Sequence, residues 1–394
     1  MSEEFSAKRR LLFILNDAPF FVSHRLSLAA AARRAGFDVH VAVAHDADAV
    51  AIIESAGIHH HDIPLKRGAR GPLGELRLIF RLANIIRSLR PDLIHTVTMK
   101  PVLYGGSLAR LMKVPAVVNA VTGLGYLFLI EGTLARLQRG IIKRIYRFAL
   151  GQPNGRAIFQ NPDDLRLFLD EGLVAPDDSI IIKGTGVDMN LFQFLPEPAD
   201  EPIVMFPARV IGDKGIHQFV SAARTLKGEG LSARFVIVGR TDPDNPTDVG
   251  ESKIREWERD GLVEWWGFSN DMASTLPKAH IVCMPSYREG LPRVLIEAAA
   301  SGRPIVTADV PGCREIVKHG ENGFLVPVRD GAATAEAIAR LLADDELRHQ
   351  MAQRSREMAE RDYAMDKFIA KTFAVYEKLI PNSLQAAAAN SVTA

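Results

Sequence analysis

The sequence is short of cysteine and of long apolar runs. Only Cys283 and Cys313 occur in 394 residues, so no disulfide framework holds the fold together, and a reducing cytoplasm is the expected compartment. The apolar run Leu11–Leu15 ends at Asn16, far short of a signal sequence or a spanning helix. No later run reaches the ~18 uninterrupted apolar residues of a membrane span, so we expect a chain that does not cross a bilayer.

Net charge is nearly absent as well, at +1 for the whole chain, but this balance hides an asymmetry. Basic side chains exceed acidic ones by about six up to Leu195, and acidic ones exceed basic ones by about five after it. The length favours two domains of roughly 190 residues each. Because one half is basic and the other acidic, we expect the two halves to differ in the partners that they bind.

The chain is rich in short strands that alternate with amphipathic helices. Such alternation favours parallel sheets covered by helices on both faces and joined by right-handed crossovers. The predicted strands are Leu11–Leu15, Val39–Val43, Leu93–Thr96, Val117–Val121, Ile203–Phe206, Phe235–Val238, His280–Met284 and Pro304–Thr307. The predicted helices include Phe21–Arg34, Gly74–Leu89, Leu134–Leu150, Ile216–Leu226 and Pro292–Ser301. The expected fold class is α/β, with two Rossmann-like doubly wound domains facing a cleft, where ligands bind in such sheets.

The alternation pauses at a proline-rich, acidic stretch. Residues 196–202 hold three prolines and three acids, which suit neither a helix interior nor a central strand. We interpret them as the linker between a first domain over 8–195 and a second over 203–362. Residues 363–382 are predicted to be a helix that either finishes the second domain or crosses back to the first. The tail 383–394 is expected to be disordered.

The segment Met284–Glu297 carries the most chemical information. It leaves a predicted buried strand and enters a helix, with Pro292 suited to the first helical turn. The amides from Gly290 through Val294, together with the helix dipole, form an expected anion site. Glu289 and Glu297 flank this site, and their carboxylates would accept hydrogen bonds from sugar or ribose hydroxyls.

Two cations upstream complete the expected phosphate site. Arg209 follows the first strand of the second domain, and Lys214 opens the helix after it. Both therefore lie at the carboxyl end of one strand, where a diphosphate would rest. Their charge would stabilise a departing nucleotide as the bond between sugar and phosphate breaks.

Taken together, these blocks resemble the retaining glycosyltransferase family 4. Glu289 and Glu297, with seven residues between them, look like its paired-glutamate signature. Arg209 and Lys214 match its basic pair, and the likeness covers about residues 8–380. The resemblance implies a GT-B fold, retention of the anomeric configuration, and transfer with no cofactor and no metal ion.

The resemblance also assigns roles at the matching positions. The expected catalytic residues, which would hold the diphosphate and the transferred sugar, are Arg209, Lys214 and Glu289. Glu297 would hold the ribose of the donor. The further donor-binding residues would be Gly290, Leu291, Pro292, Arg293 and Val294 at the helix start, with Gly239, Arg240, Gly267 and Phe268 bordering the base.

The first domain resembles a narrower subgroup, whose members extend lipid-linked oligosaccharides, capsule or O-antigen units. The likeness rests on Asn16-Asp17, Phe21, His24-Arg25, Met99-Lys100-Pro101 and Val121–Tyr126. It implies an acceptor side formed by Asn16, His24, Lys100, Thr122 and Gly123, and a polyprenyl-diphosphate-linked saccharide as the acceptor. Many family members carry a histidine where Thr122 stands, so this chain lacks the histidine that contacts the donor sugar in those members.

Several patterns have a structural interpretation beside a functional one. His59-His60-His61 invites a metal site, but consecutive side chains of a strand diverge, so a surface strand end is favoured. Asp242-Pro243-Asp244 resembles the manganese motif of another transferase fold, yet its surroundings favour a turn. Arg293 could form a structural ion pair with a nearby acid or contact a ligand. The same two alternatives apply to Arg314 and Glu315, which could pair for structural reasons.

A basic helix is predicted over 134–150, where Arg139, Lys143 and Arg144 interleave with apolar residues, and a second basic stretch runs from Lys66 to Arg90. Such a helix either lies on anionic lipid or packs on the core with a solvated basic face. The basic excess of the first half favours an anionic membrane surface as a partner.

Two functional hypotheses follow. The first is a cytoplasmic retaining glycosyltransferase, peripheral on the inner face of the cytoplasmic membrane. It would move a hexose or N-acetylhexosamine from a nucleotide diphosphate sugar, with uracil favoured over guanine as the base, to the lipid-linked saccharide. The second is a sugar-nucleotide epimerase or a non-catalytic nucleotide-sugar-binding protein on the same fold. The full donor signature favours the first, and no nucleic-acid partner is expected.

Overall fold

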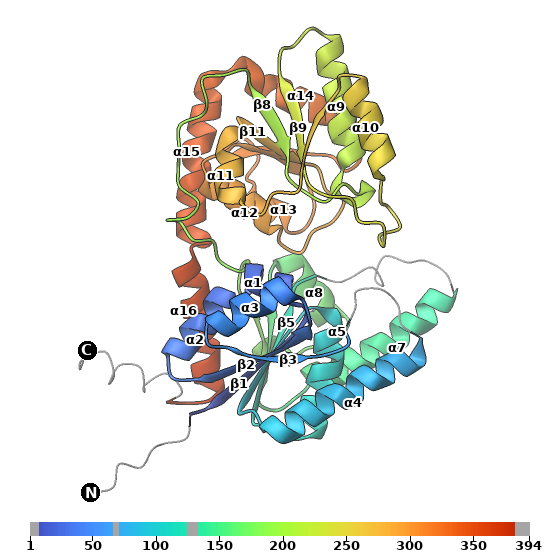
Figure 1. Ribbon diagram of the computed structural model, residues 1–394, viewed down its shortest axis with the longest axis vertical. Coiled ribbons are helices and arrows are strands. Elements are labelled where there is room, and N and C mark those ends of the chain that lie inside the picture. The colour runs from blue at the N-terminus through green and yellow to red at the C-terminus, as the bar shows by residue number, and fades with distance from the viewer. Residues whose placement is uncertain (1–7, 66–70, 124–132, 383–394) are drawn as a thin grey trace, which may run out of the picture. The chain divides into compact units, whose positions relative to one another are not determined.

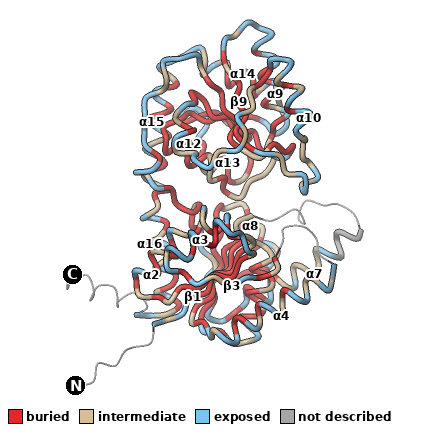
Figure 2. Tube along the Cα trace, viewed as in Figure 1, coloured by how far each residue is buried: buried red, intermediate tan, exposed pale blue. Residues whose placement is uncertain are grey.

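The computed structural model describes residues 8–65, 71–123 and 133–382, and its chain divides into two compact units (Figure 1). The chain passes from unit 1 to unit 2 at Thr185/Gly186 and returns to unit 1 at Lys367/Phe368. Each unit is built on its own parallel sheet, and the sheets are the most buried parts of the units (Figure 2). The predicted α/β class with two Rossmann-like sheets is confirmed.

Unit 1 contains a seven-stranded sheet in the order β3-β2-β1-β4-β5-β6-β7. Its strands are β1 Arg10–Asp17, β2 Asp38–Ala44, β3 His59–Asp62, β4 Leu93–Val97, β5 Ala116–Val121, β6 Gly155–Phe159 and β7 Ser179–Ile181. Its helices are α1 Ala18–His24, α2 Leu26–Arg34, α3 Ala47–Ser55, α4 Pro72–Leu89, α5 Met99–Pro101, the π-helical η1 Val102–Gly106, α6 Ser107–Leu111, α7 Thr133–Leu150, α8 Pro162–Asp170, the short η3 Pro176–Asp178, and α16 Met365–Leu379.

The central strand β1 shows why helices cover both faces of this sheet. Leu12 and Ile14 point to one face, where they share a buried cluster with Leu82 of α4. Phe13 points to the other face, where its ring lies 5.8 Å from that of Phe21 on α1. Because alternate residues of a strand face opposite sides, an unbroken apolar run such as this one fits only a strand that is covered twice.

Unit 2 contains a six-stranded parallel sheet in the order β10-β9-β8-β11-β12-β13. Its strands are β8 Ile203–Phe206, β9 Arg234–Val238, β10 Glu264–Gly267, β11 Ile281–Met284, β12 Ile305–Ala308 and β13 Gly323–Val326. Its helices are the short η4 Gly212–Lys214, α9 Ile216–Gly228, α10 Glu251–Arg259, α11 Met272–Thr275, the short η5 Leu276–Lys278, α12 Arg293–Ala300, α13 Cys313–Ile316, α14 Gly331–Ala343 and α15 Asp345–Asp362.

Residues 196–202, which the sequence presents as a linker, lie inside unit 2. The Arg303 side chain donates hydrogen bonds to the carbonyls of Leu195 and Pro196, at 2.9 and 3.3 Å. The Glu197 carboxylate is held by Arg348 at 2.8 Å. This stretch forms neither helix nor strand, but buried arginines bind the Pro196 carbonyl and the Glu197 carboxylate, and the unit boundary falls about ten residues earlier.

The last helix, α16, belongs largely to unit 1 although α15 before it belongs to unit 2. The Tyr376 hydroxyl and His95 Nδ1 of β4 are 2.6 Å apart, and both side chains are buried. The ring of Phe37 also packs edge-on against Tyr376. Of the two arrangements that the sequence left open for this helix, the structure has the one in which it returns to the first domain.

The predicted helix Phe21–Arg34 is two helices, because the backbone of Arg25, at φ −135°, leaves the helical region between α1 and α2. The tail 383–394 and residues 124–126 of the subgroup motif lie outside the described residues. Among the described helices, none is long and apolar enough to cross a bilayer.

Candidate functional site

In unit 2, strands β8 and β11 are neighbours although β9 and β10 lie between them in sequence. The strand order therefore reverses between β8 and β11, and the loops that follow these two strands diverge there. Ligands of doubly wound sheets bind at such a switch point, beyond the carboxyl ends of the strands. Arg209 and Lys214 follow β8, while Glu289 follows β11, so the topology brings these predicted residues to one point.

Lys214 and Glu289 form an ion pair across the switch point. Their side chains are only 20% and 11% exposed. Two backbone contacts hold the loops together, because Tyr287 N donates to Asp213 O at 2.9 Å and Gly215 lies against Pro285. Gly215 has φ +80°, and a Cβ there would lie 2.1 Å from the Pro285 carbonyl oxygen, so only glycine fits.

Arg209 is paired with Asp242, which lies after β9. The two loops approach closely, because a Cβ on Gly239 would lie 1.8 Å from the Ala208 carbonyl oxygen. Asn245 N donates to Asp242 O at 2.8 Å, so the Asp242-Pro243-Asp244 segment lies in a turn. The first carboxylate of that segment thus holds the predicted phosphate-binding arginine in place.

The second predicted glutamate lies inside α12. Glu297 accepts a hydrogen bond from Arg293 Nε at 2.6 Å, one helical turn earlier. Burial raises the pKa of Glu297 above its usual value, although Arg293 acts against this effect. Pro292 has no N–H, so it cannot contribute a donor to the predicted anion site at this helix start. Gly312, after β12, closes the other side, since a Cβ there would lie 2.4 Å from Gly290 O.

Between β11 and the first residue of α12, two buried polar side-chain atoms have no hydrogen-bond partner within the part of the chain that the structure describes. They are Ser286 Oγ, on a fully buried residue, and Arg293 Nη1. Buried donors of this kind are normally satisfied, so each indicates a place for a ligand or water. Ser286 was not assigned a role from the sequence, because a serine in a loop gives no signal of its own.

The residues predicted to border the base lie at the carboxyl ends of β9 and β10, on the side of β8 away from β11. The Gly239 N–H donates to Gly267 O at 2.8 Å, which joins the ends of these two strands. The Arg240 guanidinium lies over the ring of Phe268, 5.1 Å from its centroid. Phe268 is 58% exposed, so this apolar ring with its stacked cation is available for contact.

Four of the five predicted acceptor residues of unit 1 lie at or just after the carboxyl ends of β1, β4 and β5, three adjacent strands. Asn16 is near the end of β1, and its Oδ1 is buried without a partner among the described residues. Lys100 follows β4 and pairs with Glu75 of α4 at 2.9 Å. Thr122 and Gly123 follow β5 directly. His24 lies apart, on the last turn of α1, with its ring stacked on Phe20.

Thr98, between β4 and α5, is a residue that sequence reasoning missed. Its φ of +75° and ψ of 167° lie in a region that a residue with a side chain rarely adopts. Its Oγ1 is buried without a partner among the described residues. Thr98 follows β4, the same strand as Lys100, and β4 is adjacent to β1, which carries Asn16. A strained backbone and an unsatisfied hydroxyl at such a place are typical of a functional position.

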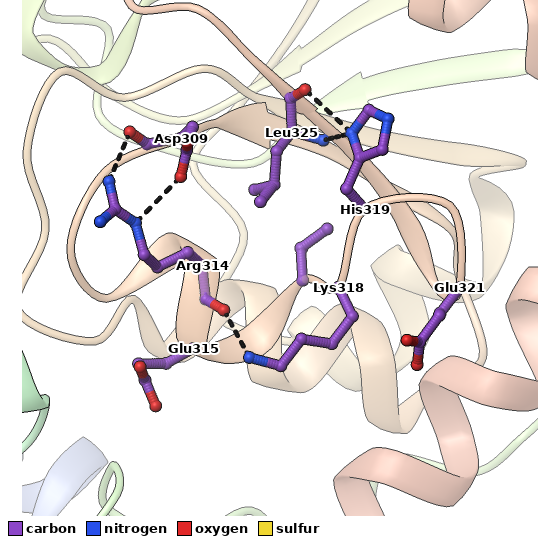
Figure 3. Close-up of a pocket in the computed structure, with 8 residues that line it drawn as sticks. Asp309, Arg314, Glu315, Lys318, His319, Glu321 and Leu325 are labelled. Carbon is purple, nitrogen blue, oxygen red and sulfur yellow. Dashed lines mark hydrogen bonds and ion pairs between the residues drawn. The ribbon is translucent and has the colours of Figure 1, made fainter.

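A pocket of about 430 Å³ lies elsewhere in unit 2, beside α13 (Figure 3). Its lining mixes acids and bases, and Arg314 pairs with Asp309 at 2.9 Å while Lys318 Nζ donates to the Arg314 carbonyl. Glu315 also lines this pocket. None of the predicted donor-binding residues lines this pocket. The ion pair of Arg314 with Asp309 favours the structural interpretation of Arg314.

Comparison with known proteins gives the family. Residues 188–358 match the model of the glycosyl transferases group 1, and residues 10–152 match that of the glycosyl transferase 4-like proteins. An N,N'-diacetylbacillosaminyl-diphospho-undecaprenol alpha-1,3-N-acetylgalactosaminyltransferase of Campylobacter jejuni is 28% identical over 80% of this chain and 85% of its own. A UDP-Gal:alpha-D-GlcNAc-diphosphoundecaprenol alpha-1,3-galactosyltransferase of Escherichia coli is 24% identical over 78% and 81%.

The solved structures agree on the fold. HepE of Anabaena in complex with UDP superposes with a TM-score of 0.75 at 19% identity, over 94% of this chain and all of that one. Both units and their order are shared with such proteins, and the chain is a glycosyltransferase with the GT-B architecture. It belongs to the group 1 glycosyltransferases of family 4, and its relatives include proteins of capsule and lipopolysaccharide core biosynthesis.

Proposed function

We propose that this glycosyltransferase moves a hexose or N-acetylhexosamine from a UDP-sugar to a polyprenyl-diphosphate-linked saccharide, with retention of configuration. The observation that supports the proposal is the ion pair of Lys214 and Glu289 at the switch point of unit 2. Arg209 follows the same strand as Lys214, and α12 follows the same strand as Glu289. The preference for UDP draws on HepE, whose solved complex contains UDP. The lipid-linked acceptor draws on the Campylobacter and Escherichia relatives, whose names specify undecaprenyl-diphosphate-linked saccharides.

In the proposed mechanism, the diphosphate displaces the acids from their cations. Lys214 and Arg209 leave Glu289 and Asp242 and bind the phosphates, while Arg293 Nη1 and the first amides of α12 supply further donors. Glu289, released from Lys214, accepts a hydrogen bond from the sugar, and Glu297 holds the ribose. The acceptor hydroxyl attacks C1 from the side of the leaving group, the bond from C1 to the phosphate oxygen breaks, and the departing phosphate takes the proton.

A donor screen tests the donor half of this proposal. Thermal unfolding is followed with UDP, GDP and ADP in the absence of added metal, for the wild type and for Lys214→Ala. We expect UDP to raise the unfolding temperature of the wild type selectively, by mass action on the folded state, and to lose most of this effect in the variant. Lys253→Ala, which removes a lysine from an exposed ion pair on α10, is the matched control and should keep the response.

An acceptor assay tests the other half. With undecaprenyl-diphosphate-linked N-acetylglucosamine as a first probe, we expect transfer from a UDP-sugar and a product with the donor's anomeric configuration by NMR. Nucleotide binding without any transfer to lipid-linked acceptors would favour the non-catalytic binding protein. Interconversion of the sugar without an acceptor would favour the epimerase. Inversion at C1 would refute the front-face mechanism while leaving the family unchanged.

A lipid-linked acceptor requires access to a membrane, and we propose that α4 provides it as a peripheral anchor on the cytoplasmic face. Leu73, Leu76 and Phe80 are 83%, 50% and 67% exposed, and their spacing puts them on one face of the helix. The opposite face, with Leu78 and Leu82, is buried in unit 1. Arg77 and the other arginines of α4 would meet anionic headgroups.

The basic helix α7 contributes less to this surface than its sequence suggests. Lys143 pairs with Glu171 at 2.6 Å, and the Arg147 guanidinium donates to the carbonyls of Glu171 and Gly172. Cosedimentation with anionic vesicles should therefore fall strongly for Leu76→Ser/Phe80→Ser and little for Lys143→Ala. Leu191→Ser, which alters an equally exposed leucine of unit 2, is the control. Unchanged sedimentation of the α4 variant would refute this anchor.

A further inference from the structure

The edge of the unit 1 sheet gathers four side chains that can bind a metal ion. Strands β2 and β3 run parallel, with His40 opposite His59 and Ala42 opposite His61. Registered residues of neighbouring strands point to the same face, and so do residues two apart on one strand. Asp38 and His40 of β2 therefore share one face with His59 and His61 of β3, while His60 points to the other face.

This arrangement revises the interpretation of the histidine triplet. The three consecutive histidines do diverge, as expected, so the triplet alone makes no site. The missing ligands come from the neighbouring strand, 19 to 21 residues earlier in the chain, because the parallel register aligns them. His60 is directed instead to the carbonyl oxygen of Val43, 3.4 Å away.

We propose that Asp38, His40 and His59 form a binding site for a divalent transition-metal ion, with zinc as its best ligand, and that His61 holds the His40 ring in place. Asp38 Oδ2 lies 3.2 Å from His40 Nε2, and Asp38 Oδ1 lies 3.4 Å from His59 Nε2. One ligand atom from each residue falls within 4.8 Å of the others. Donor atoms around tetrahedral zinc are spaced about 3.3–3.5 Å apart, given metal–ligand distances of about 2.0–2.2 Å.

Each of the two histidine nitrogens thus already lies at zinc spacing from one oxygen of the Asp38 carboxylate, Oδ2 for His40 and Oδ1 for His59. A single carboxylate oxygen can serve both histidines after rotation of the His59 side chain, which is 64% exposed and has its ring stacked on that of His40. The partly buried His40 is the fixed point of the site. Its second ring nitrogen, Nδ1, is 3.0 Å from His61 Nε2, and a hydrogen bond at that position orients a metal-binding imidazole and sets its tautomer.

The chemistry of these ligands selects the class of ion. Two imidazoles and one carboxylate suit zinc and its first-row neighbours, whereas magnesium and calcium prefer sites made of oxygen atoms alone. Three protein ligands at a half-exposed position leave the remaining coordination to water. Arg10, whose charge acts on His40, opposes cation binding, but its Nη1 is engaged by the Leu89 carbonyl at 2.7 Å.

The place of the site indicates what the ion does. Asp38 and His59 are the first residues of β2 and β3, so the ion lies at the amino ends of the strands. Asn16, Lys100 and Thr122 lie at or after the carboxyl ends of their strands, at the other end of the sheet. A metal ion here would cross-link β3, a four-residue edge strand, to β2 and stabilise unit 1 without taking part in sugar transfer.

The test uses the full chain, purified without a polyhistidine tag and stripped with EDTA. Isothermal titration with zinc measures affinity, and cobalt absorbance reports tetrahedral coordination. We expect one zinc ion per chain, a rise in unfolding temperature on zinc addition, and no response to magnesium. His59→Ala should weaken zinc binding by at least about tenfold, and His61→Ala by about tenfold, through loss of a ligand and of its support respectively.

His60→Ala is the matched control, since it removes the middle histidine of the triplet from the opposite face, and it should bind zinc within about twofold of the wild type. Equal weakening in His60→Ala and His59→Ala would overturn the proposal, because it would indicate loose binding to the histidine run. Absence of zinc binding in the wild type would overturn it as well. Sugar transfer is expected to be the same with and without zinc, so this result is independent of the proposed function.

Discussion

The ion pair of Lys214 with Glu289 can contribute to stability, to catalysis or to both, and removal of Lys214 distinguishes these roles. In Lys214→Ala, a carboxylate that is 11% exposed loses its partner. Breaking a fully buried pair costs about 3–5 kcal/mol, whereas an exposed pair is worth at most about 1 kcal/mol. Because the two side chains keep some contact with solvent, we expect the free energy of unfolding to fall by about 2 kcal/mol. For a unit of this size, that lowers the unfolding temperature by roughly 4–8 °C.

Activity should respond differently from stability. If Lys214 neutralises the departing diphosphate, its loss removes a charge interaction of the transition state, and kcat should fall by about 10²–10³-fold, or about 2.7–4 kcal/mol. The double variant Lys214→Ala/Glu289→Gln no longer has an unpaired carboxylate, so it should recover much of the lost stability. It should recover none of the lost turnover, because the cation is still absent. Glu289→Gln alone should keep UDP binding but lose turnover.

The assay combines thermal unfolding with release of UDP under saturating donor, at a temperature where every variant is folded. Lys253→Ala, which removes half of an exposed pair, should change neither quantity appreciably. The reasoning is refuted if the double variant regains both stability and turnover, since the pair would then be structural only. It is also refuted if Lys214→Ala is destabilised but turns over at the normal rate.

Two further predictions concern backbone and pH. Gly215→Ala should lower the free energy of unfolding, measured in urea, by about 3 kcal/mol, because its Cβ would meet Pro285 O at positive φ. The control Gly230→Ala, at the same φ but in open space, should lower it by only about 1 kcal/mol. Equal losses in the two variants would contradict the close approach of Gly215 to Pro285. Burial holds the pKa of His95 well below its usual range, while the unfolded chain takes up a proton near pH 6.5. As the pH is lowered through 6.5, the free energy of unfolding should therefore decrease, by up to about 1.4 kcal/mol per pH unit for this group. The decrease should be shallower in His95→Gln, and parallel pH profiles of the two proteins would contradict this prediction.

Much of the fold follows from sequence pattern because both sheets are buried on both faces. The predicted strand Ile203–Phe206 has the same bounds as β8, and Val117–Val121 differs from β5 by one residue. A run of apolar, β-branched residues in such a sheet has no alternative that buries it equally well. The break at Arg25 was missed, since it depends on a single backbone conformation and not on hydrophobic periodicity.

The candidate site was predictable only in part. The sequence places Arg209, Lys214 and Glu289 after particular strands, and the strand order then brings them together. Sequence spacing could not reveal Asp242 as the partner of Arg209, because that contact depends on β8 and β9 being adjacent. The same limit applies to His40 and His59, whose proximity is a consequence of strand register.

The return of α16 to unit 1 has a consequence for synthesis on the ribosome. Unit 2 is continuous in sequence, so all of its core is available once residue 367 has emerged. Unit 1 begins first but lacks Tyr376, the buried partner of His95, until all of unit 2 has been made. The unit begun first is thus completed after the second, and a nascent chain carries a partly open first unit throughout translation of the second.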